Sequence, residues 1–125
     1  MSELAGSSAV EGGDAFAALW REIGGSLHER WPLRAMARRL GCSPSTLQRE
    51  CRRRCGHGAH RELLRLRLGH AREVLRATAY PLRVVAELVG YADPFTFSAA
   101  YRRWAGHAPS TERRGGARGA RGARP

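Results

Sequence analysis

The stretch GYADPFTFSAAYRRWAGHAP, residues 90–109, repeats a pattern that is already present in GCSPSTLQRECRRRCGHGA, residues 41–59. In each stretch a glycine is followed by a short polar residue, Ser43 or Asp93, and then by a proline. A short polar side chain followed by proline is typical of a helix N-cap and the first helical position. Both stretches end on Gly-His, and glycine commonly terminates a helix. The repeat therefore predicts two helices of similar length, 50 residues apart.

A second amphipathic segment precedes each of these helices. Apolar residues recur at i, i+3, i+4 and i+7 after a proline and before a glycine, which predicts a buried helical stripe. The two stripes are Leu33, Met36, Ala37 and Leu40, and Leu82, Val85, Ala86 and Val89. The inward i, i+4 pairs of the following helices are Leu47 with Cys51 and Phe97 with Tyr101. Two helices joined by a short turn containing glycine form a helix-turn-helix, so we expect one at about 33–56 and another at about 82–106.

The remaining sequence favours an all-α fold. Residues 59–77 carry one apolar stripe and predict a long linker helix, about 27 Å in length at 1.5 Å per residue, and residues 16–27 predict one further amphipathic helix. We expect a seven-helix domain over residues 15–114, with two helix-turn-helix subdomains joined by a central linker helix. Residues 1–14 are expected to form a flexible N-terminal tail, and residues 115–125, rich in Arg, Gly and Ala, a disordered one.

The charge of the chain points to a polyanionic partner. There are 22 basic residues, all of them arginine, against 11 acidic ones, which gives a net charge of +11. Nucleic acid is the first candidate and an anionic membrane surface the second. No apolar run approaches the roughly 18 residues of a membrane span, and the N-terminus lacks a signal-peptide pattern. We therefore expect no membrane partner and a bacterial, cytoplasmic, nucleoid-associated protein.

The segment from Gly90 to Pro109, with the pattern G-Y-x-D-x-x-x-F-S-x-x-Y-R-R-x-x-G-x-x-P, resembles the signature of the AraC/XylS family of transcription regulators. Other matched positions fall in the linker helix and the first motif: Arg67, Leu68, Ala71, Leu33, Met36, Ala37, Gly41 and Ser43. The resemblance implies a domain that binds double-stranded DNA as a monomer, with two lobes that enter adjacent major grooves. It also implies activation through RNA polymerase as the commoner mode of regulation.

The chain departs from the family pattern in three respects. Family members usually carry this domain behind a larger effector-binding or dimerisation domain, whereas a short segment precedes it here. A stand-alone regulator and a fragment that lacks its dimerisation domain both remain open. Cys51 stands where the family generally has phenylalanine, which predicts less buried volume in the first lobe. Ala99 stands where a basic residue is common, so the second recognition helix is expected to read few bases.

The candidate base-reading residues lie on the outward faces of the two recognition helices. On the first helix Ser45, Gln48 and Arg49 are expected to face out, since arginine can pair bidentately with guanine and glutamine with adenine. On the second helix Phe95, Thr96 and Ser98 offer no bidentate donor and can touch a thymine methyl group or a phosphate. We therefore predict two unequal half-sites, the second read mainly through shape and backbone. Candidate phosphate contacts are Ser43, Arg52, Arg53, Arg102 and Arg103.

Other functions receive less support from the sequence. Cys51, Cys55, His57 and His60 lie within ten residues and raise the alternative of a metal or redox sensor. Zinc needs four convergent ligands, however, and the repeat places Cys51 on a core face. A non-specific basic nucleic-acid-binding protein would account for the charge but not for the duplicated capped helices. The sequence lacks a phosphate-binding glycine loop and a paired-carboxylate cleft, so we expect neither an enzyme nor a cofactor.

Overall fold

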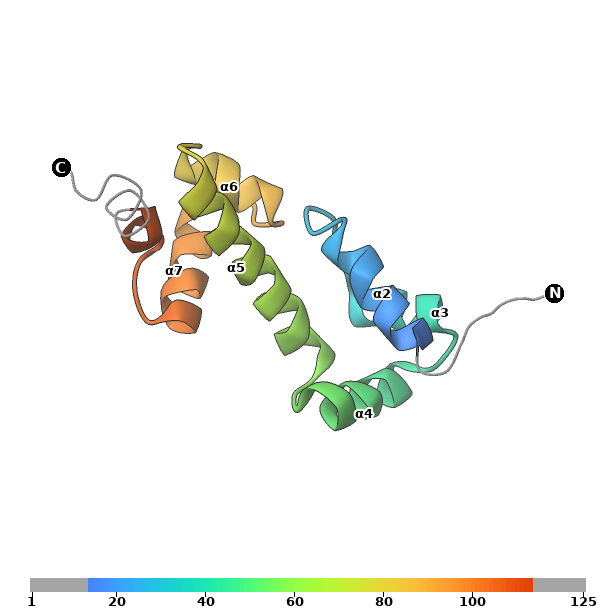
Figure 1. Cartoon of the computed structure of the whole chain (residues 1–125). Coiled ribbons are helices and arrows are strands. Elements are labelled where there is room, and N and C mark those ends of the chain that lie inside the picture. Colours follow the sequence, from blue (N-terminus) through green and yellow to red (C-terminus); the bar gives the residue numbers. More distant parts are fainter. Residues whose placement is uncertain (1–13, 114–125) are drawn as a thin grey trace. The chain divides into compact units, whose positions relative to one another are not determined.

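The computed structural model describes residues 14–113, and within this range the regular structure is entirely helical. Figure 1 shows the helices in chain order, with residues 109–113 forming a further helical segment at the end. Their bounds are α2 (Asp14–Gly24), α3 (Leu33–Leu40), α4 (Pro44–Cys55), α5 (Ala59–Ala77), α6 (Leu82–Leu88) and α7 (Pro94–Ala105). The predicted all-α, seven-helix class is confirmed over the described residues. The predicted terminal tails lie outside them, apart from Asp14, which begins α2.

The helices divide into two compact units, of which the first ends at Leu63 and the second begins at Leu64. Each unit holds one pair of consecutive helices with a short connection, α3–α4 in the first and α6–α7 in the second. Helix α5 supplies its first turn to the first unit and the rest of its length to the second.

The helix starts and stops follow the local sequence. The Ser43 hydroxyl accepts a hydrogen bond from the Thr46 amide at 3.1 Å, and an Asp93 carboxylate oxygen accepts one from the Thr96 amide at 2.8 Å. Each side chain thereby satisfies one of the amides that a helix start leaves unpaired. Helix α4 is followed by Gly56, which caps its end and adopts φ +82°, a left-handed conformation that favours glycine. These local signals explain why the repeat produces two similarly bounded helices.

The first unit packs its helices around α3, which contacts both α2 and α4. Its buried apolar side chains come from these helices, the turn after α2 and the start of α5. They are Phe16, Leu19, Ile23, Leu27, Trp31, Met36, Ala37, Leu47, Cys51, Ala59 and Leu63. Burial raises the pKa of the Cys51 thiol to about 11, so this cysteine behaves as a small core residue.

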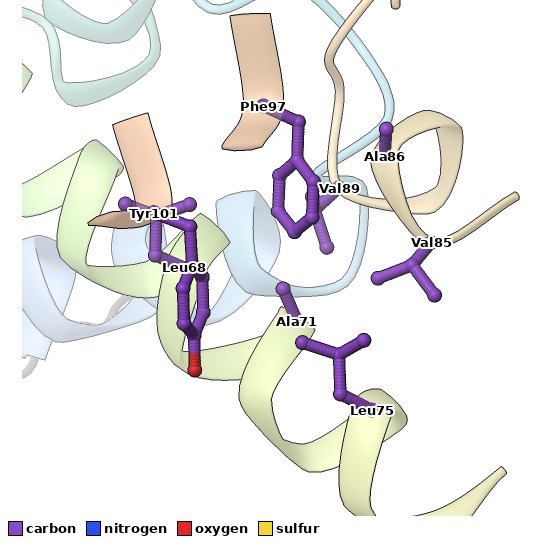
Figure 2. Close-up of a cluster of buried hydrophobic side chains, with 8 residues drawn as sticks. All are labelled: Leu68, Ala71, Leu75, Val85, Ala86, Val89, Phe97 and Tyr101. Atoms are coloured by element: carbon purple, nitrogen blue, oxygen red, sulfur yellow. The ribbon is translucent and has the colours of Figure 1, made fainter. Parts of the chain in front are cut away.

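The second unit has a larger aromatic component in its core. Figure 2 shows the buried cluster, which α5, the α6 segment and α7 supply together. Its members are Leu68, Ala71, Leu75, Val85, Ala86, Val89, Phe97 and Tyr101. The Phe97 and Tyr101 rings lie 5.8 Å apart between centroids, a tilted aromatic contact that adds to area burial. The first unit has Leu47 and Cys51 at the equivalent positions, so it buries less side-chain volume there.

A buried carboxylate ties the end of the described chain to the second unit. Glu112 accepts hydrogen bonds from the Tyr101 hydroxyl at 2.6 Å, Arg72 Nε at 2.9 Å and Arg76 Nε at 3.0 Å. Burial raises the pKa of Glu112, but the hydrogen bonds from these three groups outweigh it and leave that pKa below its usual value. Burial and the bond to Glu112 raise the pKa of Tyr101 to about 12. Glu112 is therefore ionised and paired at neutral pH.

Candidate nucleic-acid interface

Helix α4 exposes the polar face that the sequence predicts opposite its core. Leu47 and Cys51 are fully buried, whereas Ser45, Arg49 and Arg52 are exposed. The hydroxyl of Thr46 accepts a hydrogen bond from Arg49 at 3.3 Å, which leaves most of the guanidinium donors available. This face consequently presents hydroxyl and guanidinium donors on the second helix of a helix-turn-helix.

The arginines near the end of α4 are partly neutralised within their own helix. Glu50 forms ion pairs with Arg53, three residues on, and with Arg54, whose Nε lies 2.8 Å from the carboxylate. Hydrogen bonds from these two arginines lower the pKa of Glu50. The Arg53 side chain is still 68% exposed, so its charge can be turned toward an external anion at the loss of a surface ion pair that is worth about 0–1 kcal/mol.

Gln48 departs from the outward orientation that its position predicts. Its side-chain oxygen accepts a hydrogen bond from the backbone amide of Ala59 at 2.8 Å, and the residue is half-buried. The sequence pattern places Gln48 on the outward face of α4, but the start of α5 returns past this side of the helix and covers it in part. The carboxamide is therefore bound to the protein's own backbone.

Helix α7 presents a different surface. Phe95 is 83% exposed, the largest exposed fraction among the large hydrophobic residues that the structure describes. Ala99 is exposed as well and offers no donor, while Ser98 is half-buried. The exposed Thr96 is held by Asp93, because its hydroxyl donates to the Asp93 carboxylate at 2.9 Å. The start of α7 thus offers an apolar ring in place of free polar groups.

Asp93 also gives α7 an electrostatic character unlike that of α4. Hydrogen bonds from the Thr96 amide and hydroxyl lower the pKa of the Asp93 carboxyl, so it is ionised at neutral pH. The corresponding cap on α4, Ser43, is neutral. A carboxylate at a helix start is stabilising for the helix but repels an incoming phosphate. The two units therefore differ in how well their helix starts accommodate an anion.

Arg102 and Arg103 supply the positive charge of the second unit's recognition helix. Both side chains are exposed in the last turn of α7, as Arg52 and Arg53 are in α4. The structure thus places nine of the eleven predicted site residues on the surface, with Gln48 and Ser98 only half-exposed. Repetition of the arginine pair at the same helical position gives each unit a basic flank.

Sequence reasoning did not predict two acidic side chains, Glu62 and Glu112, that contact the histidines just after the recognition helices. Glu62 lies 2.7 Å from His57, and Glu112 lies 3.4 Å from His107. Both pairs have the same spacing, and the second follows the first by 50 residues. The repeat therefore extends one turn beyond each recognition helix, a signal that was available in the sequence.

The rival sites find no support in the described part of the chain. Residues 14–113 contain no group of three or more His, Cys, Asp or Glu side chains that could hold a metal ion. Within the same residues, none of the helices combines the length and apolar character needed to cross a membrane. The three cysteines in this range, Cys42, Cys51 and Cys55, form no disulfide.

Two capped helix-turn-helix pairs, each with exposed arginines on its second helix, define a class of protein, the helix-turn-helix DNA-binding domains. A family model described as "Helix-turn-helix domain" matches residues 36–115, more than half of the chain. The chain belongs to the AraC/XylS family of transcription regulators, as its sequence resemblance predicts. The family is one of DNA-binding regulators and is not a class of enzymes.

Individual relatives agree with this assignment. The chain is 40% identical over 52 residues to the raffinose operon transcriptional regulatory protein RafR of Pediococcus pentosaceus, a match that covers 42% of this chain and 19% of that protein. It is 35% identical over 80 residues to the HTH-type transcriptional regulator GlxA of Rhizobium meliloti (strain 1021), covering 64% of this chain and 25% of GlxA. The chain thus spans a quarter or less of these curated relatives.

The fold is shared with solved structures. One is the DNA-binding domain of AdpA, a global transcriptional factor, whose crystal structure was determined in complex with a target DNA. The TM-score is 0.78 with 24% sequence identity, and the match covers 88% of this chain and 98% of that one. The all-α architecture with two helix-turn-helix motifs is therefore the fold of an AraC-type DNA-binding domain.

Proposed function

We propose that this chain binds specific sequences of duplex DNA and regulates transcription by inserting α4 and α7 into adjacent major grooves. The observation that carries the proposal is the exposed face of α4, where Ser45 and Arg49 lie opposite the buried Leu47 and Cys51. A helix of this kind fits the major groove, and arginine pairs bidentately with guanine there. A shared family and a basic net charge of +11 support the same function.

The proposed contacts fall into two groups. Arg49 and Ser45 contact base edges in the first half-site, and Phe95 contacts the second. Thr96 and Ser98 contribute less, because one is tied to the Asp93 cap and the other is half-buried. Phosphate contacts come from the exposed side chains that flank the recognition helices: Ser43, Arg52, Arg53, Arg102 and Arg103.

This division makes the half-sites unequal. The α4 surface offers guanidinium and hydroxyl donors, which can distinguish one base pair from another. The α7 surface offers a phenyl ring, alanine and an ionised Asp93, so its share of the affinity comes from apolar contact and from Arg102 and Arg103. We expect most of the sequence information in the first half-site and weaker, shape-dependent information in the second.

Regulation is proposed from the family. We propose that the domain binds as a monomer and activates transcription through contact with RNA polymerase at promoters in the bacterial nucleoid. Since the curated relatives are four or more times longer than the matched segment, an effector-binding or dimerisation domain in the same polypeptide would be compatible with this role.

Site selection from a random duplex library at near-physiological salt tests the proposal. We expect two unequal motifs with centres about 10 base pairs apart. Salt-sensitive binding without enrichment of any sequence would refute it. That result would support the second candidate, a non-specific basic nucleic-acid-binding protein, which the exposed arginine pairs on α4 and α7 also favour.

A further inference from the structure

The start of α5 has no side chain of its own to cap it. The Glu62 amide donates to the Gly58 carbonyl at 3.1 Å, which makes Gly58 the N-cap and Ala59 the first helical residue. Glycine has no side chain that could accept a hydrogen bond from the first-turn amides. Ala59 is fully buried, so water is excluded from the residue whose amide must be paired.

Gln48 supplies the missing acceptor from another helix. Its side-chain oxygen lies 2.8 Å from the Ala59 amide nitrogen, across a separation of 11 residues. Gly58 makes this approach possible, because a Cβ at that position would stand 2.9 Å from the same Gln48 oxygen. That separation is shorter than real Cβ contacts, so a side chain at position 58 would displace the carboxamide.

The second copy of the repeat provides an internal comparison. Fifty residues further on, Gln48, Gly58 and Ala59 are replaced by Ser98, Ala108 and Pro109. Proline has no amide hydrogen, so the second copy has no donor at this position that needs an acceptor. The long carboxamide and the glycine that admits it are absent from the same copy. The three positions therefore change together, as expected if their shared role is to pair one amide.

We infer that Gln48 is a positioning residue, which caps α5 from α4 and thereby holds the first recognition helix against the turn that follows it. The inference rests on the proposed DNA-binding function. A bidentate contact with adenine uses the amide oxygen and nitrogen of glutamine together, and here the oxygen is bound to Ala59. The remaining Nε2 group can only donate, and N7 of adenine and N7 of guanine are both acceptors. Gln48 therefore does not select adenine.

Two substitutions break the same hydrogen bond from its two sides. Gln48→Met keeps the length of the side chain but removes the acceptor, and Gly58→Ala displaces the acceptor while leaving Gln48 in place. Gly69→Ala is the matched control, because it adds a Cβ to α5 where no atom lies within 4 Å. Gln48→Glu is the conservative variant, because a carboxylate oxygen can still accept from Ala59.

The first measurement is amide hydrogen exchange at Ala59 in the full chain, followed by NMR. Exchange should become faster in Gln48→Met and in Gly58→Ala, and should stay slow in Gln48→Glu and Gly69→Ala. The second measurement is the Kd for the selected duplex and for each of its single base-pair substitutions, at a temperature where every variant remains folded. Both disrupting variants should raise all of these Kd values by a common factor of about five, with base preferences unchanged.

Two results would overturn the inference. Loss of preference at a single A·T pair, in Gln48→Met but not in Gly58→Ala, would show that Gln48 reads a base. An unchanged Kd in both variants would show that the hydrogen bond affects stability alone, because a purely structural role does not alter the affinity of protein that is already folded. Failure of the wild-type chain to select any sequence would instead count against the proposed function, and exchange at Ala59 would still decide whether Gln48 is the cap.

Discussion

Glu112→Gln should destabilise the second unit by about 2 kcal/mol. The carboxylate is 3% exposed and accepts hydrogen bonds from Tyr101, Arg72 and Arg76. A glutamine of the same shape keeps an oxygen for the Tyr101 hydroxyl but loses the charge that faces both arginines. Hydrogen bonds to charged groups contribute about 1.5–3 kcal/mol, and we take the lower part of this range because the Arg72 and Arg76 side chains are 34% and 57% exposed.

Urea denaturation followed by NMR separates the two units. With an m value of about 1 kcal/mol per molar for a small protein, the midpoint for α7 amides should fall by about 2 M, and that for α4 amides should change little. Glu73→Gln is the matched control, because this α5 carboxylate is 79% exposed and its loss should cost less than about 0.5 kcal/mol. Equal midpoints for Glu112→Gln and the wild type would refute the assigned role of the carboxylate.

The same carboxylate predicts a pH dependence. The pKa of Glu112 in the folded unit is lower than in the unfolded chain, where it is about 4.3. A depressed folded-state pKa contributes stability above the unfolded pKa, and this contribution is lost as pH falls through the folded one. The difference in unfolding free energy between wild type and Glu112→Gln should therefore be constant from pH 7 to about pH 5 and shrink below it. A difference that keeps its pH 7 value down to pH 2 would contradict this.

The DNA contacts and the buried thiol can each be tested by a single change. In competition binding, Arg49→Ala should remove one base preference worth about 1–3 kcal/mol. Arg102→Ala should weaken binding to all sequences alike and reduce the slope of log affinity against log salt concentration by about 0.9. A changed base preference in Arg102→Ala would refute the phosphate role of this arginine. If Phe95 contacts a thymine methyl group, uracil in place of that thymine should weaken wild-type binding about fourfold, since a methyl group contributes about 0.8 kcal/mol. The same replacement should not affect binding by Phe95→Ala. Equal losses of affinity in the wild type and in Phe95→Ala would exclude the contact. Cys51 is buried and its pKa is raised to about 11, whereas Cys42 is half-buried. Alkylation at pH 8 followed by mass spectrometry should therefore label Cys42 before Cys51, and equal rates would contradict the burial of Cys51.

Much of the fold could be predicted because its signals are local. Caps such as Ser43 and Asp93 act on amides three residues away, and Gly56 ends a helix through its own backbone conformation. The inward pairs Leu47–Cys51 and Phe97–Tyr101 follow from helical periodicity alone, and all four side chains are fully buried. These features need no knowledge of how distant segments meet.

The remaining features depend on contacts that periodicity does not encode. A helical pattern divides residues into core and surface, but it does not show that the Ala59 amide arrives beside Gln48 from the next segment. The Glu112 carboxylate meets Arg72 and Arg76 across 40 and 36 residues. The spacing from His57 to Glu62 is the same as that from His107 to Glu112. Identical spacing in both copies indicates that each copy forms the same His–Glu contact, and this signal was present in the sequence.

The two copies of the motif have diverged in a way that couples stability to recognition. In the second copy Phe97 and Tyr101 supply the buried contacts of α7, so the exposed side chains of that helix are not needed to stabilise the fold. The first copy has Cys51 in place of the tyrosine and uses a recognition-helix side chain, Gln48, to pair a buried amide. A substitution that changed Gln48 to a base-reading residue would therefore leave the Ala59 amide unpaired. A change of specificity at position 48 should therefore require a second substitution that removes the amide donor at position 59. Ala59→Pro is such a substitution, because proline has no amide hydrogen, and the second copy already has proline at the equivalent position, Pro109.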